Sequence, residues 1–224
     1  MAARRFSLFS SVVTKILIAV TGLSLALFLC VHLAGNLLLH AGQAKFNAYS
    51  HALISNQFVV PAEIGLAAIF LLHVFEAVTN WFADRSARPT AYAMKRPAGG
   101  TSRKSVASTT MIWTGSITFV FLVVHILTMK YGAWYTVEGM EVRDLHRLVV
   151  ETFRSPLWTG FYTVCMAVVG FHLWHGLSSA FESLGLDNPR LTPTVVKAGR
   201  MIAVVLGGGF VSIPLWLHFL GGRS

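Results

Sequence analysis

Four histidines lie inside apolar stretches of the sequence, and their side chains are the best suited to chemistry there: His32, His73, His125 and His172. An imidazole in a hydrocarbon environment is costly unless its nitrogens find partners. Neutral imidazole is also a common ligand of iron, zinc and copper. Each of these histidines is therefore expected either to bind a metal centre or to make a hydrogen bond between helices, the latter worth about 0.6 kcal/mol.

The last of these histidines lies in residues 170–185, which read GFHLWHGLSSAFESLG. His172 and Gly176 are one helical turn apart and share a face, where the glycine leaves room for a flat ligand. His175 is three residues beyond His172 and also lies close to that face. It is therefore the alternative to His172 as a ligand.

The composition indicates a membrane protein. Of the 224 residues, 54% are hydrophobic and 12% charged, whereas about 25% charged is usual in soluble domains. The net charge is +9, but the basic residues lie between apolar runs and form no continuous basic face, which argues against a nucleic-acid partner. Cys30 and Cys165 belong to no CxxCH or CxxC motif, which disfavours covalent haem and thiolate zinc sites.

Five apolar segments predict an all-α bundle of five transmembrane helices in one domain, because each approaches the roughly 20 residues that cross a bilayer. They are residues 16–39, 59–82, 106–129, 157–177 and 198–220. The first segment is longer than the roughly 7–15 apolar residues of a signal peptide, and no small-residue cleavage site follows it. We therefore expect it to be a retained helix. Pro214 is expected to kink the fifth helix.

The distribution of Lys and Arg predicts the orientation. Twelve of these 18 residues fall in the N-terminus and the second and fourth loops, and six fall on the opposite side. The N-terminus is therefore expected on the cytoplasmic side of a bacterial-type inner membrane. The outer loop 131–154 carries both signs of charge and is expected to hold a short surface helix. That helix would include Glu141, Arg143, Asp144, His146 and Arg147.

The rise of about 1.5 Å per residue converts helix position into depth. In a core of about 30 Å, His32 and His125 lie about 24 and 28 Å from the inner edge, and His73 and His172 about 8–9 Å from it. The histidines thus sort into an outer pair on the first and third helices and an inner pair on the second and fourth. Zinc would also suit four imidazoles, but the two depths separate them.

Two such pairs are what two stacked bis-histidine b-type haems require, because each iron takes an imidazole from each of two facing helices. The two irons would lie on the order of 15 Å apart along the membrane normal. The remaining histidines of the outer side, His40, His51, His146 and His218, are assigned to loop roles or to contacts with haem propionates.

Several motifs together resemble a known family, the five-helix diheme cytochrome b membrane anchor of succinate:quinone oxidoreductases, which are succinate dehydrogenases and fumarate reductases. The motifs are TGLSLALFLCVHLAGNL, LLHVFEA followed by ARPTAY, TTMIWTG through VVHI, GFHLWHGLSSAFESLG and GFVSIP. The resemblance covers essentially the whole chain. Each piece is modest alone, and the combination is specific.

The resemblance implies two haems b and a pair of partners, a flavoprotein subunit and an iron–sulfur subunit. The partners would oxidise succinate, a step of the tricarboxylic acid cycle, and this respiratory-chain subunit would pass the electrons to a membrane quinone. By the same resemblance, His32 and His125 would ligate the distal haem, and His73 and His172 the proximal haem. The spacing of His172, Gly176 and Gly185 favours His172 over His175. A higher oligomer of the complex is compatible with this assignment.

Other charged residues receive roles from their positions. Lys15, Arg103, Lys104 and, on the outer side, His40 are candidates for contacts with haem propionates; contact with lipid headgroups is the alternative for the three basic residues. Glu63 lies one turn inside the outer end of the second helix and is the candidate for binding a quinone or moving its proton. Glu76 is the inner alternative. Menaquinone would suit an outer quinone site.

Two rival functions remain. The chain could anchor another respiratory enzyme, of the hydrogenase or formate dehydrogenase type, with the same haem arrangement. It could also be a haem-free transporter or scaffold, which predicts no chromophore and little effect of replacing single histidines.

Overall fold

The computed structural model describes residues 10–87, 106–137, 142–186 and 188–221, and these are all-helical with no strands. The elements in chain order are α1 (Ser11–Asn36), η1 (Leu37–Ala41), α2 (Gln43–Ile54), α3 (Val59–Ser86), α4 (Val106–Thr109), α5 (Met111–His125), the π-helical turn η2 (Ile126–Lys130), α6 (Leu145–Arg154), α7 (Pro156–Ser183) and α8 (Thr192–Phe219). Their order matches the predicted five-helix architecture, with short helices added in the loops.

Five helices are long and apolar enough to cross a membrane: α1 with η1, α3, α5 with η2, α7 and α8. The prediction of a multi-pass all-α protein is confirmed in this respect. Most helices extend beyond the predicted apolar segments, because helical hydrogen bonding continues into the polar flanks. Ser10, for example, caps α1 by accepting a hydrogen bond from the Val13 amide. The segment predicted to begin at residue 106 is divided into α4 and α5.

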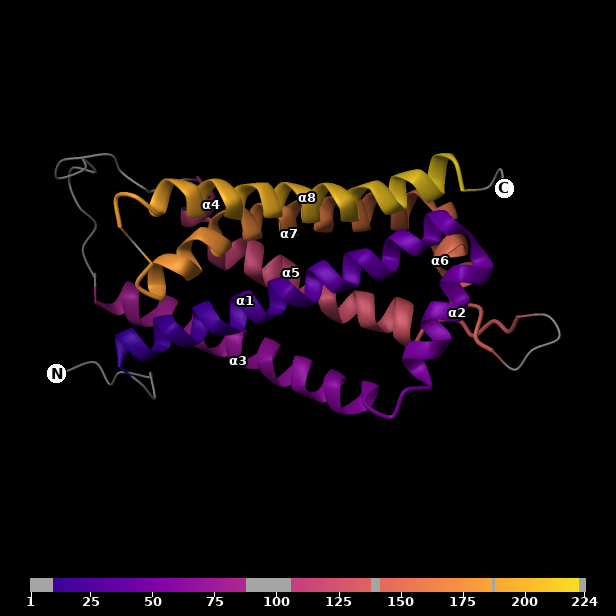
Figure 1. The fold of residues 1–224 in the computed structure, drawn as a ribbon, viewed down its shortest axis with the longest axis horizontal. Helices are drawn as coiled ribbons and strands as arrows, with labels where there is room; N and C mark the ends of the chain where they lie inside the picture. The colour runs from indigo at the N-terminus through magenta and orange to yellow at the C-terminus, as the bar shows by residue number, and fades with distance from the viewer. Residues whose placement is uncertain (1–9, 88–105, 138–141, 187, 222–224) are drawn as a thin grey trace.

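The long helices run side by side, with the two ends of the chain on opposite sides (Figure 1). We call the end where α1, α5 and α8 begin the near end, and the end where α8 finishes the far end. Helices α3 and α7 run in the opposite sense, from the far end to the near end. Pro214 lies inside α8, which continues through it.

The buried core lies chiefly between α7 and α8, which pack on each other along most of their lengths. Helix α3 is different: it packs along α1, and Glu76 is its one buried residue. Most side chains of α3 are therefore exposed, as expected of a helix long and apolar enough to face lipid.

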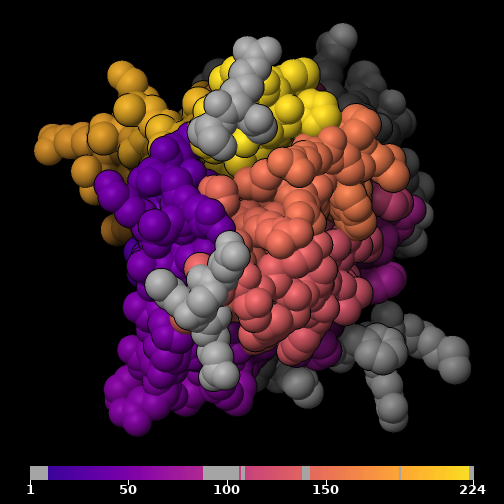
Figure 2. Space-filling model, turned by 90° about the vertical axis from the view of Figure 1, so that its right-hand side faces the viewer, coloured from indigo at the N-terminus to yellow at the C-terminus, as the bar shows by residue number. Residues whose placement is uncertain are grey.

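A polar junction between α2 and α6 closes the far end, where these segments lie side by side (Figure 2). The Asp144 carboxylate, 3% exposed, accepts hydrogen bonds from Gln43 and Asn47 at 2.6 and 2.7 Å. Asp144 also caps α6 by accepting from the Arg147 amide. The short helix predicted in residues 131–154 is therefore present as α6, but it begins after Arg143 and Asp144 rather than including them. Glu141 lies outside the described residues.

Candidate functional site

The outer histidines predicted from the sequence meet at the far end. His32 of α1 and His125, the last residue of α5, have ring centroids 5.9 Å apart with planes at 87°. Phe28 stacks on His32 at 5.2 Å, and Phe121 stacks on His125 at 5.5 Å. We call His32 and His125 the far pair.

The separation within the far pair matches two imidazoles that share a metal ion. Metal–nitrogen bonds of about 2 Å place the two nitrogens about 4 Å apart, and the ring centroids roughly another ångström behind each nitrogen, hence about 6 Å apart. In addition, Nδ1 of His125 is buried and has no hydrogen-bond partner. A buried polar atom without a partner carries a free-energy cost of about 1–3 kcal/mol. The far pair therefore has a geometry that suits metal binding, and its hydrogen bonding is incomplete in the protein alone.

The inner histidines are each held by a threonine of a neighbouring helix. Nδ1 of His73 lies 3.1 Å from Oγ1 of Thr21, and Nδ1 of His172 lies 3.0 Å from Oγ1 of Thr114. Both threonines are buried. The described residues show no ring contact between His73 and His172, so the two histidines are related by their equivalent threonine contacts. We call His73 and His172 the near pair.

A glycine next to each threonine lets the imidazole approach the helix. A Cβ added to Gly22 would lie 3.2 Å from Cε1 of His73, and one added to Gly115 would lie 3.4 Å from Cε1 of His172. The separation at Gly22 is tighter than ordinary van der Waals contact and that at Gly115 is at its lower limit, so a side chain at either position would meet the imidazole ring. The two near-pair histidines are thus held in the same way, His73 by α1 and His172 by α5.

This equivalence has a counterpart in the sequence. Residues 21–32, TGLSLALFLCVH, and 114–125, TGSITFVFLVVH, are identical at 6 of 12 positions. Each copy supplies the Thr-Gly that holds a near-pair histidine, the phenylalanine that stacks on a far-pair histidine, and that histidine itself. We call this pattern the TG-H repeat. Neither the repeat nor a role for Thr21 and Thr114 was predicted from the sequence, although the repeat was there to find.

The repeat also sets the spacing between the two pairs. Thr21 and His32 are 11 residues apart, as are Thr114 and His125. Eleven residues of α-helix span about 16 Å. The threonines that hold the near pair therefore lie about that distance along the helices from the far pair, in agreement with the separation inferred from the sequence.

The two far-pair imidazoles contact each other, and within the part of the chain that the structure describes the four imidazoles form no larger group. Among the described residues, no three His, Cys, Asp or Glu side chains lie together in a way that could hold a metal ion. A metal centre held by two protein ligands needs its remaining ligands from a bound group. Both cysteines are free thiols, Cys30 exposed and Cys165 buried.

The remaining histidines belong to neither pair. His175 is half-buried on α7 near His172, and no hydrogen bond to its imidazole occurs in the described part of the chain. His40 packs on Trp216 with ring centroids 4.2 Å apart. Nδ1 of His218 lies 2.9 Å from the Phe153 carbonyl. In α6, burial lowers the pKa of His146, against the opposing effect of the Asp144 carboxylate, and His51 is exposed at the end of α2.

The charged candidates occupy both ends of the bundle. Lys15 is exposed near the start of α1, whereas Arg103 and Lys104 lie outside the described residues. Glu63 forms an ion pair with Lys130 at the far end, between α3 and the last residue of η2. Glu76 is 2% exposed, three residues after His73. Lys130 was not predicted from the sequence as the partner of Glu63.

An arginine fixes the end of the helix that carries His125. The Arg143 guanidinium donates to the carbonyls of Met129, Lys130 and Ala133 at 3.1, 3.0 and 3.4 Å. It thereby satisfies carbonyl groups at the end of η2, where helices leave their last carbonyls without partners. Burial lowers the pKa of Arg143 from its usual value, and arginine remains charged at any physiological pH.

Comparisons of the chain with protein-family models, with curated proteins and with solved structures find no match. A functional assignment therefore depends on the two histidine pairs and on the motifs of the sequence.

Proposed function

We propose that this protein is the membrane-anchor cytochrome b of a succinate:quinone oxidoreductase, which carries electrons from an iron–sulfur partner subunit through two haems b to a membrane quinone. The observation that carries the haem assignment is the contact of His32 with His125 at one end of the bundle, together with the matching threonine contacts of His73 and His172. The succinate and partner assignments are supported by the sequence motifs. In this proposal the near end faces the cytoplasm, as the charge distribution predicts.

The chain supplies the axial imidazoles. His32 and His125 would hold one haem, and each of them ends one copy of the TG-H repeat. His73 of α3 and His172 of α7 would hold the other haem. Bound haem supplies a one-electron iron couple whose potential depends on its axial ligands and surroundings. The residues of this chain orient the imidazoles, cover one face of each far-pair ring with the stacked Phe28 and Phe121, and fix the separation between the two sites.

The exposed apolar surface of α3 supports the same proposal. Helix α3 carries His73, yet it buries one residue against the rest of the protein. A porphyrin between α3 and the other helices would bury apolar surface that the protein alone leaves open. Burial of apolar surface contributes about 25 cal/mol per Å², so binding of haem would stabilise the position of α3.

The quinone is assigned to the far end, with Glu63 as the proton-accepting group. The ion pair with Lys130 provides both a carboxylate and a cationic donor at the same boundary of the membrane. A quinone that takes two electrons must also take two protons, and a carboxylate beside an ammonium group can deliver them from the aqueous side. The chain is assigned no flavin or succinate site, so it works only within the complex.

The test is the haem content of the purified full-length chain, together with its reduced-minus-oxidised spectrum. Two b-type haems per polypeptide are expected. The succinate assignment is tested separately, by purifying the chain from its native membrane with its partners. Copurification of a flavoprotein and an iron–sulfur protein, with haem reduction on addition of succinate, is expected. If hydrogen or formate reduces the haems and succinate does not, the cytochrome assignment stands and the succinate assignment is wrong. If the purified chain contains no haem, the whole proposal is wrong.

A further inference from the structure

Thr21 and Thr114 are placed to decide which nitrogen of each near-pair imidazole carries the proton. The hydroxyl of Thr21 donates to the Leu17 carbonyl at 2.6 Å, and that of Thr114 lies 3.2 and 3.1 Å from the carbonyls of Thr110 and Met111. A hydroxyl has one hydrogen. When that hydrogen points to a backbone carbonyl, the oxygen can only accept from the imidazole.

We propose that Thr21 and Thr114 are positioning residues that hold the near-pair histidines with a proton on Nδ1 and a free lone pair on Nε2. This inference depends on the proposed haem function. An imidazole that donates from one nitrogen is a better metal ligand at the other, because the hydrogen bond raises its basicity. The two threonines thus fix ring orientation, tautomer and donor strength together.

The far pair lacks this arrangement. Nδ1 of His125 is buried without a partner, and neither His32 nor His125 makes a hydrogen bond through its ring among the described residues. The two haems should therefore differ in how strongly their ligands donate. Removing a threonine hydroxyl should affect the haem of the near pair and leave the haem of the far pair unchanged.

The sharper variant is Thr114→Val, which keeps the shape of the side chain and removes its oxygen. At Thr21 the Ile18 carbonyl also lies near the His73 ring and offers a substitute acceptor. The matched control is Thr118→Val, one turn further along α5, because the Thr118 hydroxyl donates to the Thr114 carbonyl and touches no imidazole. Both variants are made in the full-length chain, and the midpoint potential of each haem is measured by a redox titration followed by absorbance.

The expected result for Thr114→Val is a more positive midpoint potential for one of two haems, since weaker donation stabilises ferric iron less. The other haem and the Thr118→Val protein should be unchanged. Equal shifts of both haems, no shift, or the same shift in the control would overturn the inference. If Thr114→Val loses a haem, Thr114→Ser should restore it; failure to do so also overturns the inference. If the protein binds two haems but neither potential changes in Thr114→Val, this inference is wrong and the proposed function still stands.

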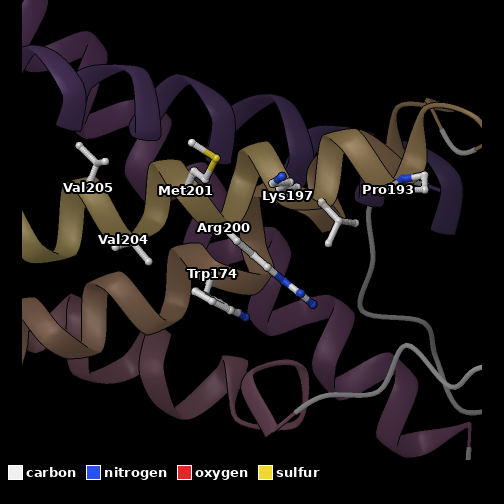
Figure 3. A pocket seen from close by; sticks show the side chains of 8 residues that line it. Trp174, Pro193, Lys197, Arg200, Met201, Val204 and Val205 are labelled. Atoms are coloured by element: carbon white, nitrogen blue, oxygen red, sulfur yellow. The ribbon is translucent and has the colours of Figure 1, made fainter.

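A second observation is independent of haem. A groove of about 630 Å³ lies along α8 at the near end, with Trp174 of α7 on its other wall (Figure 3). Lys197 and Arg200 lie toward the start of α8, and the Arg200 guanidinium lies 5.3 Å from the centroid of the Trp174 ring. Within the described residues, neither cation pairs with a carboxylate.

The lining of the groove changes along the helix axis from charged to apolar. Beyond the two cations it continues along exposed Met201, Val204 and Val205. Val205 is eight residues past Lys197, or about 12 Å deeper along the helix. Two positive charges at the membrane boundary, followed by an apolar groove, match a molecule with an anionic head and a hydrocarbon tail. A quinone is a poorer match because it has no charged head, and an acidic protein surface is a poorer match because it would leave the apolar part of the groove unused.

We infer that this groove binds an anionic phospholipid of the near-end leaflet, its phosphate at Lys197 and Arg200 and an acyl chain along Val204 and Val205. Trp174 reports on the site, because brominated acyl chains quench nearby indole fluorescence. The full-length chain is reconstituted in phosphatidylcholine vesicles that contain either brominated phosphatidylglycerol or brominated phosphatidylcholine. The Trp174 signal is the difference between the protein and its Trp174→Phe variant.

Stronger quenching of Trp174 by the brominated phosphatidylglycerol is expected. The difference between the two lipids should disappear in Lys197→Gln/Arg200→Gln and persist in Arg85→Gln/Arg190→Gln, which removes the same charge at the same end of the bundle. Equal quenching by both lipids in the unmodified protein would overturn the inference without any variant. Equal loss of the difference in both double variants would also overturn it, because that outcome shows general attraction to basic residues.

Discussion

Gly170 of α7 and Gly207 of α8 meet backbone to backbone. A Cβ added to Gly207 would lie 2.9 Å from the Gly170 Cα, and one added to Gly170 would lie 3.1 Å from the Gly207 Cα. Small residues at a crossing allow two membrane helices to approach closely and gain van der Waals contact. Because α7 also carries His172, this contact fixes one histidine of the near pair relative to the most densely packed part of the protein.

Replacing Gly207 with Ala should therefore destabilise the protein. The new methyl group meets backbone atoms, which cannot move aside as a flexible side chain can, and overpacking of this kind costs about 1–3 kcal/mol. Gly208→Ala is the control, because a Cβ there meets nothing within 4 Å. Thermal unfolding in one detergent compares the two, and an equal loss in both variants would refute the importance of the contact.

Removing one far-pair ligand should remove one haem. His32→Ala and His125→Ala each leave a single imidazole for that haem, whereas the near pair keeps both of its ligands. Haem content per polypeptide should fall from two to one, with the near-pair haem spectrum unchanged. Loss of both haems in a protein that remains folded would argue against two independent pairs.

Glu63→Gln should slow electron transfer to quinone while both haems remain bound, because the amide cannot accept a proton. Lys130→Gln should also slow it, since Glu63 then loses its cationic partner. Quinone reduction by the purified complex measures the effect, and haem content serves as the control. If Glu63→Gln turns over quinone at the normal rate, the quinone site lies elsewhere, with Glu76 as the next candidate.

The far-end junction should weaken in acid. Burial raises the pKa of Asp144, but hydrogen bonds from Asn47, the Arg147 amide and Gln43 outweigh it, so the pKa lies below its ordinary value. A carboxyl with a lowered pKa stabilises the folded state above its unfolded pKa, and this stabilisation is lost as the pH falls through the folded pKa.

Asp144→Asn tests this directly. The variant should be less stable at neutral pH by about 1–3 kcal/mol, because the buried donors lose a charged acceptor. Its stability should also change less than that of the unmodified protein as the pH falls below about 4, the ordinary carboxyl range. Parallel slopes for the two proteins across that range would show that Asp144 contributes nothing to the acid response.

The five apolar helices were predicted from the lengths of the apolar runs, and His32 and His125 were placed at similar depths from the helix rise. Their rings do contact each other, and both predictions need only the position of a residue within its own helix. The sequence did not predict α2, whose mixture of polar and apolar residues in Gln43–Ile54 resembles a loop. Nor did it predict the ion pair of Glu63 with Lys130, which are 67 residues apart and meet only through the packing of α3 against the end of η2.

The threonines of the near pair were missed for a different reason. A threonine in an apolar helix is an ordinary residue, and a hydroxyl that bonds back to its own helix needs no outside partner. Only the position of His73 over Thr21, and of His172 over Thr114, gives these residues a role. A comparison of the chain with itself would have revealed the TG-H repeat, but not which imidazoles its threonines hold.

The division of the two histidine pairs between helices has a consequence for biosynthesis if they bind haem as proposed. The far pair is complete once α5 has been made, because His125 is its second member, whereas the near pair must wait for His172 in α7. During co-translational insertion the far-pair site can therefore be assembled about 50 residues before the near-pair site, a few seconds at ordinary rates of translation. A chain arrested between α6 and α7 should hold a single cofactor, and it should be the one bound by His32 and His125.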